Sequence, residues 1–561
     1  MHIQPAIRKI VLIELILPIV LLIFGIYHGL LQTLYRAGYI KVASMLGINY
    51  YQGLTAHGVI NAIVLTTFFA VAFGHVVVTS CLKKNLHVGL AASGFVLLLI
   101  GTLLAAAMIF TGHASVLYTF YPPLKAHPLF YVGLALFVVG SWLSFYSWIP
   151  TYRLWRRENP TRKVPLAVIG IFSTFIVWQI ATVPVAVEVL FMLLPWSLGW
   201  VAEINIVLAR TLFWFFGHPL VYFWLLPTYV MYYTMLPKLA GGKLFSDFAG
   251  RFAFLLFCVL SAPLGFHHQF SDPGIGVNWK ALHTVLTSFV AIPSMMTAFT
   301  LAASMEHGAK SVGGTGLFRW WGKLPYMDAQ RWLFPYLFCG LVIFIFGGVT
   351  GIINASFSMN SLIHNTAWIP AHFHLTVGGP VFLGILGMSL YLVTGLLGSD
   401  IRNKKLALWV PYLWTLGVCT FSTGLFMGGL KGEPRRTNMG LSYVNPESTG
   451  FRSEWISGAS IGVLGGVIMT LSVCLFFFVF FRMLAEKKDL TKLDSFALIE
   501  SEAYHDENIG FVRNLKPWIV AAVIAVLCSY AIPLYNIATS KDIVGAVPFA
   551  PDSPMAQGTK K

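Results

Sequence analysis

Long apolar segments follow one another through almost the whole chain, and no other feature of the sequence constrains the fold as strongly. About thirteen of them are long enough to cross the ~30 Å hydrocarbon core of a bilayer as helices. They lie near residues 10–32, 54–82, 88–112, 127–150, 164–195, 205–237, 250–271, 280–305, 331–354, 363–397, 406–430, 457–483 and 517–538. The connections are short except for 306–330, 431–456 and 484–516. The pattern predicts an all-α integral membrane protein in which residues 1–561 form a single domain, one helical bundle.

The composition agrees with a bundle embedded in lipid. Hydrophobic residues make up 57% of the 561 residues, and charged residues make up only 10%. A soluble protein of this length needs far more charge to cover its surface, whereas lipid is the solvent of a membrane bundle. The formal net charge is +16, but the basic residues are spread between the apolar segments. This distribution is typical of membrane loops and argues against nucleic acid as a partner.

The six cysteines indicate neither a disulfide framework nor a thiolate metal site. No two of them form a CxxC pair, and most lie within apolar runs, where cysteine behaves as a small hydrophobic residue. Any bound metal must therefore depend chiefly on histidine. The first apolar run lacks a small-residue cleavage site, so it predicts a membrane span and not a cleaved signal peptide.

Basic residues gather on one side of the predicted bundle. With a cytoplasmic N-terminus, the inner loops contain most of them, including Arg8, Lys9, Lys83, Lys84, Arg153, Arg156, Arg157, Arg162, Lys163, Lys487, Lys488 and Lys492. Outer loops such as 196–204 and 355–362 contain none. By the positive-inside rule we expect the N-terminus in the cytoplasm and, with thirteen spans, the C-terminus outside.

A few spans contain histidines, although ionisable side chains are costly within a membrane. The motifs are LTAHGVINAI with His57, FFGHPLVYFW with His218 and Tyr222, GFHHQF with His267 and His268, and HNTAWIPAHFHLTVGG with His364, His372 and His374. In the predicted orientation these histidines fall in the outer halves of their spans. Any one of them is most simply a hydrogen-bonded structural histidine. The gathered set instead favours copper and haem iron, which bind nitrogen ligands.

Helical geometry divides the histidines among different metals. His372 and His374 are two residues apart, so they point about 200° apart around a helix and can serve two cofactors on opposite sides of it. His57 with His374 could supply the two axial ligands of a low-spin haem. His372 could supply the single ligand of a second, high-spin haem. The remaining three would form a copper site facing the open side of that haem: His218, His267 and His268.

Tyr222 follows His218 by four residues, so the two side chains are neighbours on one helix face. An isolated pair at this spacing is usually simple packing. Beside a copper–haem pair it has a chemical use, because breaking the O–O bond without releasing peroxide needs several electrons, and a tyrosine can supply one electron and a proton.

At these motifs the sequence resembles subunit I of the haem–copper oxidases. WFFGHPLVYFWLLP, PLGFHHQFSDPG and HNTAWIPAHFHL are long and specific to that family. The resemblance covers nearly the whole chain and implies a bundle that encloses two haems and one copper ion. It implies the ligand roles given above and a covalent bond between Tyr222 and His218. PRR at 434–436 resembles the arginine pair that binds haem propionates, so Arg435 and Arg436 are expected to bind cofactor, together with His364.

Within this family the chain resembles the B-type, ba3-like cytochrome c oxidases. The A-type has a glutamate two residues after the histidine of the GHP motif, where this chain has Leu220, and the loop LKKNLH lacks the acid that opens an A-type proton pathway. Tyr222 at the His-plus-four position argues against cbb-type oxidases and nitric oxide reductases. The B-type resemblance implies a low-spin haem of b type, a high-spin haem of a type, and a bacterial or archaeal inner membrane.

Two asparagines depart from the pattern of relatives. Asn360 stands where relatives have an acid near the haem propionates, so a carboxylate that loads protons is not expected there. Asn365 replaces the aspartate of the A-type His–Asp motif, so a magnesium site between subunits is not expected either.

Hydroxyl groups in two spans indicate a route for protons. The predicted route consists of Tyr229, Tyr233, Thr287, Ser294 and Thr297. Such hydroxyls often bond only to their own backbone. However, Tyr222, Tyr229 and Tyr233 form a stripe at helical spacing that leads to the proposed copper site, and the set resembles the single proton pathway of B-type oxidases. No entrance acid is evident in this chain, so a partner subunit would supply it. Glu188, in the fifth span, could take part in the release of protons, or it could pair with another buried side chain.

No part of the chain resembles a dinuclear copper domain or a cytochrome, so electrons should arrive through another subunit. The resemblance implies a copper-bearing subunit II fed by cytochrome c, and allows for a small single-helix subunit. The expected function is reduction of O2 to water coupled to proton translocation. The alternatives are a quinol-fed oxidase, a nitric oxide reductase with non-haem iron in place of copper, and a transporter whose histidines relay protons. Metal analysis separates oxidase from reductase, and a colourless preparation would exclude both.

Overall fold

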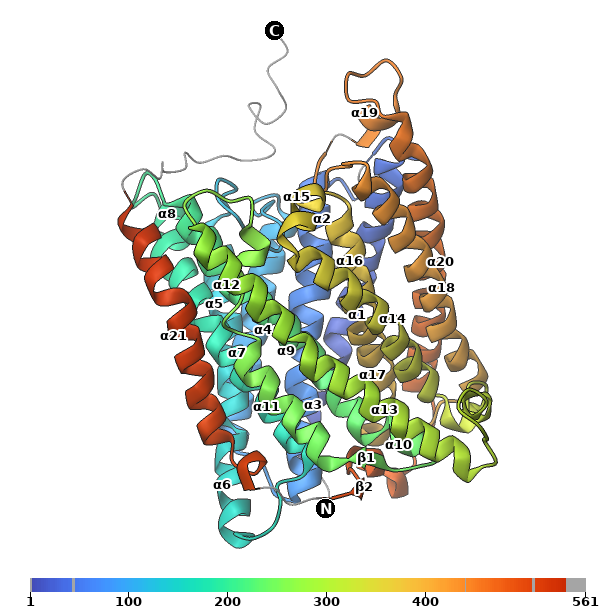
Figure 1. Ribbon diagram of the computed structural model, residues 1–561. Coiled ribbons are helices and arrows are strands. Elements are labelled where there is room, and N and C mark those ends of the chain that lie inside the picture. Colours follow the sequence, from blue (N-terminus) through green and yellow to red (C-terminus); the bar gives the residue numbers. More distant parts are fainter. Residues whose placement is uncertain (1–2, 43–45, 439, 507–509, 541–561) are drawn as a thin grey trace.

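The computed structural model describes residues 3–42, 46–438, 440–506 and 510–540. Its long helices run side by side in one bundle (Figure 1). The α-helices are α1 (Pro5–Arg36), α2 (Tyr50–Gly58), α3 (Leu65–Leu82), α4 (Val88–Phe110), α5 (Pro128–Tyr146), α6 (Trp148–Glu158), α7 (Leu166–Glu188), α8 (Leu194–Ser197), α9 (Ile206–Thr234), α10 (Leu236–Leu239), α11 (Asp247–Leu260), α12 (Val277–Phe289), α13 (Ala291–Ser311), α14 (Phe334–Ala355), α15 (Phe357–Ile363), α16 (Trp368–Thr376), α17 (Phe382–Leu397), α18 (Lys404–Leu430), α19 (Gly440–Val444), α20 (Ser453–Leu484) and α21 (Leu515–Thr539).

The other elements are short. The π-helical segments are η1 (Val59–Val64), η2 (Val189–Leu193) and η6 (Val377–Val381), and the 3-10 turns are η3 (Phe266–Gln269), η4 (Trp320–Lys323), η5 (Ala329–Arg331), η7 (Leu490–Lys492), η8 (Ala497–Ile499) and η9 (Gly510–Val512). A parallel pair of strands, β1 (Leu244–Ser246) and β2 (Ala503–His505), lies at the end of the bundle where α1 begins (Figure 1).

Twelve helices in the described part of the chain are long and apolar enough to cross a membrane. Several are composite: α2, η1 and α3 form one continuous span, and so do α16, η6 and α17. These helices coincide with twelve of the predicted segments, so the predicted all-α membrane bundle is confirmed. The side on which α1 begins is the expected cytoplasmic side and is called the inner side below. The opposite side is called the outer side.

The remaining predicted segment, 250–271, is not one continuous helix, and a count of thirteen spans is not confirmed. α11 ends at Leu260, and the chain then runs irregularly to the turn η3. Pro263 lacks a backbone N–H and disfavours helical conformation in the residue before it. Non-helical backbone at membrane depth is tolerated only inside protein, and Ala262, Leu264 and Phe266 are fully buried.

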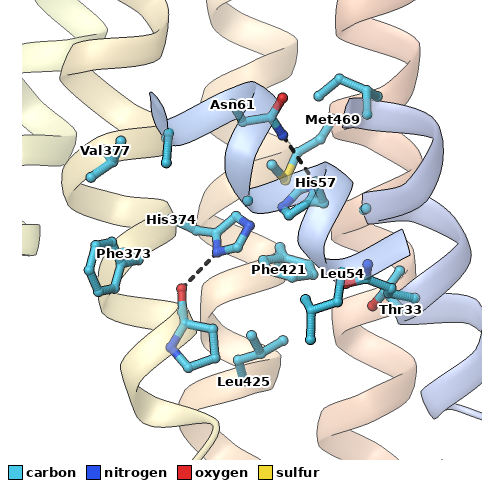
Figure 2. Close-up of a pocket in the computed structure, with 18 of the residues that line it drawn as sticks. Thr33, Leu54, His57, Asn61, Phe373, His374, Val377, Phe421, Leu425 and Met469 are labelled. Atoms are coloured by element: carbon cyan, nitrogen blue, oxygen red, sulfur yellow. Dashed lines mark hydrogen bonds between the residues drawn. The ribbon is translucent and has the colours of Figure 1, made fainter. Parts of the chain in front are cut away.

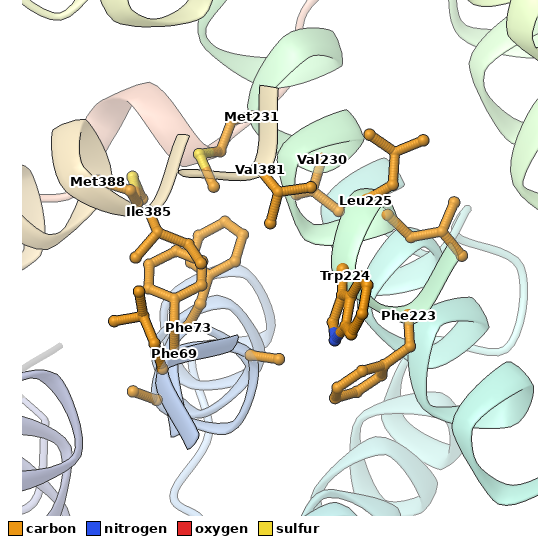
Figure 3. Packing of buried hydrophobic residues seen from close by; sticks show 14 of the residues in the cluster. Phe69, Phe73, Phe223, Trp224, Leu225, Val230, Met231, Val381, Ile385 and Met388 are labelled. Atoms are coloured by element: carbon orange, nitrogen blue, oxygen red, sulfur yellow. The ribbon is translucent and has the colours of Figure 1, made fainter. Parts of the chain in front are cut away.

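The spans that carry the predicted ligands lie at the centre of the bundle. In the most apolar stretch of the α2–α3 span 89% of the residues are buried, against 28% for α12–α13 and 22% for α21. Phe69 and Phe73 of α3 pack toward Ile385 and Met388 of α17 in this interior (Figure 3). The peripheral helices therefore separate the ligand-bearing spans from lipid.

Three π-helical segments interrupt central spans in the described chain. η1 begins two residues after His57, η2 one residue after Glu188, and η6 three residues after His374. A π turn adds one residue to the helical ladder and often occurs at functional sites. Pro380 lies within η6, where its missing N–H removes one ladder hydrogen bond. Each π segment thus follows closely on an ionisable side chain within the membrane.

Two neighbouring helix pairs meet through glycines spaced seven residues apart. Gly94 and Gly101 of α4 face Gly140 and Gly133 of α5, and a Cβ on any of the four would lie within 3.0 Å of the partner backbone. The same arrangement joins α18 to α20, through Gly417, Gly424, Gly458 and Gly465. In lipid, apolar burial gives little driving force between helices, so close backbone packing of this kind stabilises their association.

We expect Gly465→Ala to destabilise the folded protein, because the new methyl group would overlap the α18 backbone at Phe421 and Gly417. Over-packing of this kind costs about 1–3 kcal/mol, which thermal unfolding in detergent would measure. Gly348→Ala on α14 is the matched control, since a Cβ there meets no atom within 4 Å. Equal unfolding midpoints for the two variants would contradict the role assigned to the glycine contacts.

Candidate functional site

His57 on α2 and His374 on α16 face each other across a cavity (Figure 2). Their ring centres are 6.3 Å apart, and the ring planes are inclined by 17°. Metal–imidazole bonds are about 2.0–2.1 Å long, so two rings at this spacing leave room for one metal ion between a nitrogen of each. The geometry fits a haem iron with two axial histidines.

Hydrogen bonds at Nδ1 decide which nitrogen of each ring is available to a metal. His57 Nδ1 lies 2.8 Å from the carbonyl oxygen of Gly25, and His374 Nδ1 lies 2.7 Å from that of Pro370. A carbonyl only accepts hydrogen bonds, so each Nδ1 carries the proton and each Nε2 keeps its lone pair. Gly29 lets α1 pass this close, because a Cβ there would come within 2.7 Å of the His57 ring.

The cavity beside these rings is apolar along its length and basic at one end. It encloses about 310 Å³ and is lined from α1, α2, α16, α17, α18 and α20. Arg36, Arg435 and Arg436 line it together with Glu433 and Tyr50. An apolar slot with a basic end suits a haem, which is a flat apolar ring system carrying carboxylates at one edge.

Arg435 and Arg436 have no carboxylate partner among the described residues. Arg435 donates to Asn365 Oδ1 at 3.0 Å, and Arg436 donates to Thr119 Oγ1 at 3.3 Å. Burial, and then the charge of Arg436, lower the pKa of Arg435 to about 9. Two guanidinium groups held side by side in this way are stabilised when a carboxylate binds between them.

Three more imidazoles meet in a second place, and we call them the three-histidine cluster. His218 on α9 and His267 and His268 on η3 offer ligand atoms that lie within 4.8 Å of one another. His218 Nδ1 lies 3.2 Å from His268 Nε2, and Trp214 stacks on the His268 ring with centres 3.9 Å apart. A metal ion at the shared point would accept all three lone pairs, and copper favours such a set of nitrogen ligands.

The irregular chain after α11 brings His267 and His268 to one point. Adjacent residues of an α-helix project about 100° apart, whereas these two ring centres are 4.1 Å apart. His283 on α12 holds the segment, because its Nδ1 accepts the backbone N–H of Gly265 at 3.0 Å and that of Phe266 at 3.3 Å. Sequence reasoning missed His283, since no local pattern reveals a contact between these segments.

Two threonines orient the rings of two other candidate ligands. His267 Nδ1 lies 3.0 Å from Thr287 Oγ1, and His372 Nδ1 lies 2.8 Å from Thr350 Oγ1. Each hydroxyl donates its own proton to a backbone carbonyl, so each histidine must donate from Nδ1 and keeps Nε2 free for a metal. Thr287, expected on the proton route, therefore contacts a predicted copper ligand. Thr350 was not predicted.

His372 and Tyr222 lie in the same region as the three-histidine cluster. His372 is close enough to all three of its members to interact with them electrostatically. The rings of Tyr222 and His218 are 5.3 Å apart. His218 Nε2 is buried and has no hydrogen-bond partner among the described residues, so this ring presents Nδ1 to the cluster and leaves Nε2 on its other side.

The segment around α15 contains His364, the remaining residue expected to contact a cofactor. It also contains Asn360 and Asn365, the two asparagines that differ from the residues of relatives. His364 does not line the cavity; burial, and then the Arg435 charge, lower its pKa. Asn365 has a positive φ of 59° and accepts from Arg435, so it orients that guanidinium. Asn360 is buried and donates to the carbonyl of Asn354 at 2.7 Å.

Four residues of the predicted proton route meet between α9 and α13. Tyr233 and Thr297 share a hydrogen bond of 2.5 Å, and Tyr229 donates to Ser294 at 3.5 Å. Both tyrosines are fully buried. Thr300 is also buried and lies three residues beyond Thr297 on the same face of α13, toward the inner side. It was not predicted, although its spacing continues the pattern.

The sequence matches the family described as Cytochrome C and Quinol oxidase polypeptide I over residues 9–468. Cytochrome c oxidase subunit 1 of Thermus thermophilus is 40% identical over 534 residues, 93% of each chain. Ubiquinol oxidase subunit 1 of Acetobacter aceti is 25% identical over 272 residues, 48% of this chain and 36% of that one. A solved structure described as a cryo-EM structure of a heme-copper terminal oxidase dimer has a TM-score of 0.96 and 48% identity, covering 100% of this chain and 97% of that one. The chain belongs to the family of cytochrome c and quinol oxidase polypeptide I.

Proposed function

We infer that this chain is the catalytic subunit of a terminal respiratory oxidase, an integral membrane enzyme that reduces dioxygen to water. The observation that carries this function is the convergence of three imidazoles beside His372, with Tyr222 against His218. That set suits a copper ion facing a haem of which one side is open. The family match and the Thermus relative, named a cytochrome c oxidase subunit, support the same reaction.

We propose that His57 and His374 are the axial ligands of a low-spin haem of b type. Their free Nε2 atoms and the ring spacing of 6.3 Å support this assignment. Arg435 and Arg436 would bind the haem carboxylates, because they lie at one end of the cavity without a carboxylate of their own among the described residues. His364 would assist near that end through its interaction with Arg435.

His372 would bind the high-spin haem, of a type, and the three-histidine cluster would bind copper. When bound, these groups supply the place where dioxygen binds and the electrons that reduce it. Thr350 and Thr287 keep the His372 and His267 rings in the orientation that this binding requires. The Tyr222 hydroxyl would give up its hydrogen, as an electron and a proton. A covalent bond between this ring and His218 would replace one ring C–H bond and one imidazole N–H bond, and dioxygen, the substrate, would take up the two hydrogens released.

Protons would reach the centre from the inner side along the hydroxyl groups between α9 and α13. The contacts Tyr233–Thr297 and Tyr229–Ser294 support this route, and Tyr222 continues the stripe on α9. Thr287 would take part near the copper end through its contact with His267. Uptake of protons from the inner side during turnover would couple oxygen reduction to proton translocation.

Electrons would come from cytochrome c through a copper-bearing subunit II, and a small single-helix subunit would pack against the exposed spans. The basic inner loops support an N-terminus in the cytoplasm of a bacterial or archaeal cell. Because the matching family includes quinol oxidases, quinol is the second candidate donor. Steady-state oxygen consumption with each reduced donor decides between the two.

His374→Ala should remove one haem and leave the other, because the low-spin iron would lose one of two axial ligands. A pyridine haemochrome spectrum should show the haem content per chain falling to about half, with the b-type haem band lost and the a-type haem band kept. His87→Asn is the control, since His87 is exposed and its ring only caps α4. Loss of both haems, or of neither, would count against the assignment.

Tyr222→Phe should lower oxygen consumption by about 100-fold or more while haem and copper remain bound, because the variant cannot supply the hydroxyl hydrogen. Tyr232→Phe is the matched control on the same helix: its hydroxyl is buried and has no hydrogen-bond partner among the described residues. Metal analysis of the same samples separates the two enzymes considered, since iron without copper would indicate a nitric oxide reductase instead.

Thr297→Val should slow turnover by about tenfold or more, because it removes the hydroxyl that bonds to Tyr233. Oxygen consumption in H2O and in D2O measures the effect. Thr234→Val is the matched control, since the Thr234 hydroxyl donates only to the carbonyl of Val230 in its own helix. If both variants turn over at the same rate, protons do not use this route.

A further inference from the structure

Glu14 is a fully buried carboxyl group in the inner half of the membrane region. It is the tenth residue of α1, about 14 Å along the helix from its inner end, and neither of its oxygens has a hydrogen-bond partner among the described residues. Two of the cations near the inner ends of the neighbouring helices have other partners: Arg8 pairs with Asp494 and Lys84 with Glu158. No ion pair among the described residues joins Glu14 to a lysine or an arginine.

Among the described residues, His75 on α3 is an ionisable group beside Glu14, and it is also fully buried. Trp148 on α6 donates from Nε1 to His75 Nδ1 at 2.8 Å. An indole N–H can only donate, so Nδ1 must accept, and the proton of the neutral ring sits on Nε2. His75 Nε2 lies 3.9 Å from Glu14 Oε2. The N–H thus belongs to the ring atom nearest the carboxyl group.

Aromatic packing fixes Trp148 in this role. Its ring centre lies 4.7 Å from that of Phe175 and 5.6 Å from that of Phe145. Gly74 makes the space for it, because a Cβ at that position would overlap the indole ring. The imidazole tautomer is therefore held by the fold itself and does not depend on Glu14.

The gap between Glu14 and His75 suits a water molecule. At 3.9 Å the two groups are too far apart for a direct hydrogen bond, and a water between them would have three otherwise unpartnered polar atoms to bond. These atoms are both Glu14 oxygens and His75 Nε2. A proton on the carboxyl group removes the remaining penalty of an unpaired charge in a buried place.

We propose that Glu14, His75 and one enclosed water form a proton-binding site in the inner half of the membrane, which no part of the oxygen chemistry above uses. Thr79 lies one turn closer to the inner end of α3, is buried, and has a hydroxyl without a partner among the described residues. It connects the site to the inner side, so the bound proton exchanges with that side. The site sits among α1, α3 and α6, whereas the tyrosine–threonine route lies between α9 and α13.

Infrared difference spectra of the purified complex test the site directly. The wild-type minus Glu14→Gln spectrum should contain the carbonyl band of a protonated carboxyl group. This band should shift in D2O as the proton exchanges, and should move in Trp148→Phe, where the His75 tautomer is no longer held. Thr79→Val should make the D2O shift several times slower. Haem content of each variant reports whether it has folded.

Two controls keep this result separate from the proton route of turnover. Glu188→Gln removes another fully buried carboxyl group without partners among the described residues, and should leave the Glu14 band unchanged. Tyr233→Phe should leave both the band and its exchange unchanged, whatever it does to oxygen consumption. Three results would each overturn the proposal. The Glu14 difference spectrum could lack a protonated-carboxyl band, the band could fail to shift in D2O, or it could keep its position in Trp148→Phe.

Discussion

In hydrocarbon a backbone N–H or C=O has no water to bond, and this constraint governs the architecture. In the described part of the chain, helices form the periphery of the bundle, and the chain leaves helical geometry at membrane depth where protein encloses it. The irregular segment after α11 is the main case, because its residues from Ala262 to Phe266 are covered by neighbouring helices. The place where backbone can bend freely is thus also the place where two adjacent histidines can turn toward one metal.

A second regularity concerns how the imidazoles are held. His57 and His374 donate from Nδ1 to backbone carbonyls, and His267 and His372 donate to threonine hydroxyls. Each ring therefore keeps one nitrogen for a metal before any metal arrives, which lowers the cost of ordering the site. His218 is turned the other way, with Nδ1 in the cluster. This difference accords with its separate proposed role beside Tyr222.

Helical periodicity and polarity predicted the bundle and singled out the candidate ligand histidines, because those features repeat locally along the chain. They did not predict the end of α11, since Pro263 and Gly265 stand in an otherwise apolar run. Contacts between segments that are distant in the sequence could not be predicted either. Thr350 beside His372 is an ordinary threonine in the sequence, and His283 gives no local indication that it holds a loop. Periodicity specifies a face of a helix, but not what that face meets.

The glycine contacts have a consequence for assembly. α4 and α5 adjoin in the chain, and only the short α19 separates α18 from α20, so both pairs can pack as hairpins soon after they enter the membrane. Contacts between near segments form faster than those between distant ones. The proposed ligands His57 and His374 come from widely separated spans and must meet later. The α18–α20 hairpin lines the cavity beside His57 and His374, so one wall of that cavity would exist before a cofactor is inserted.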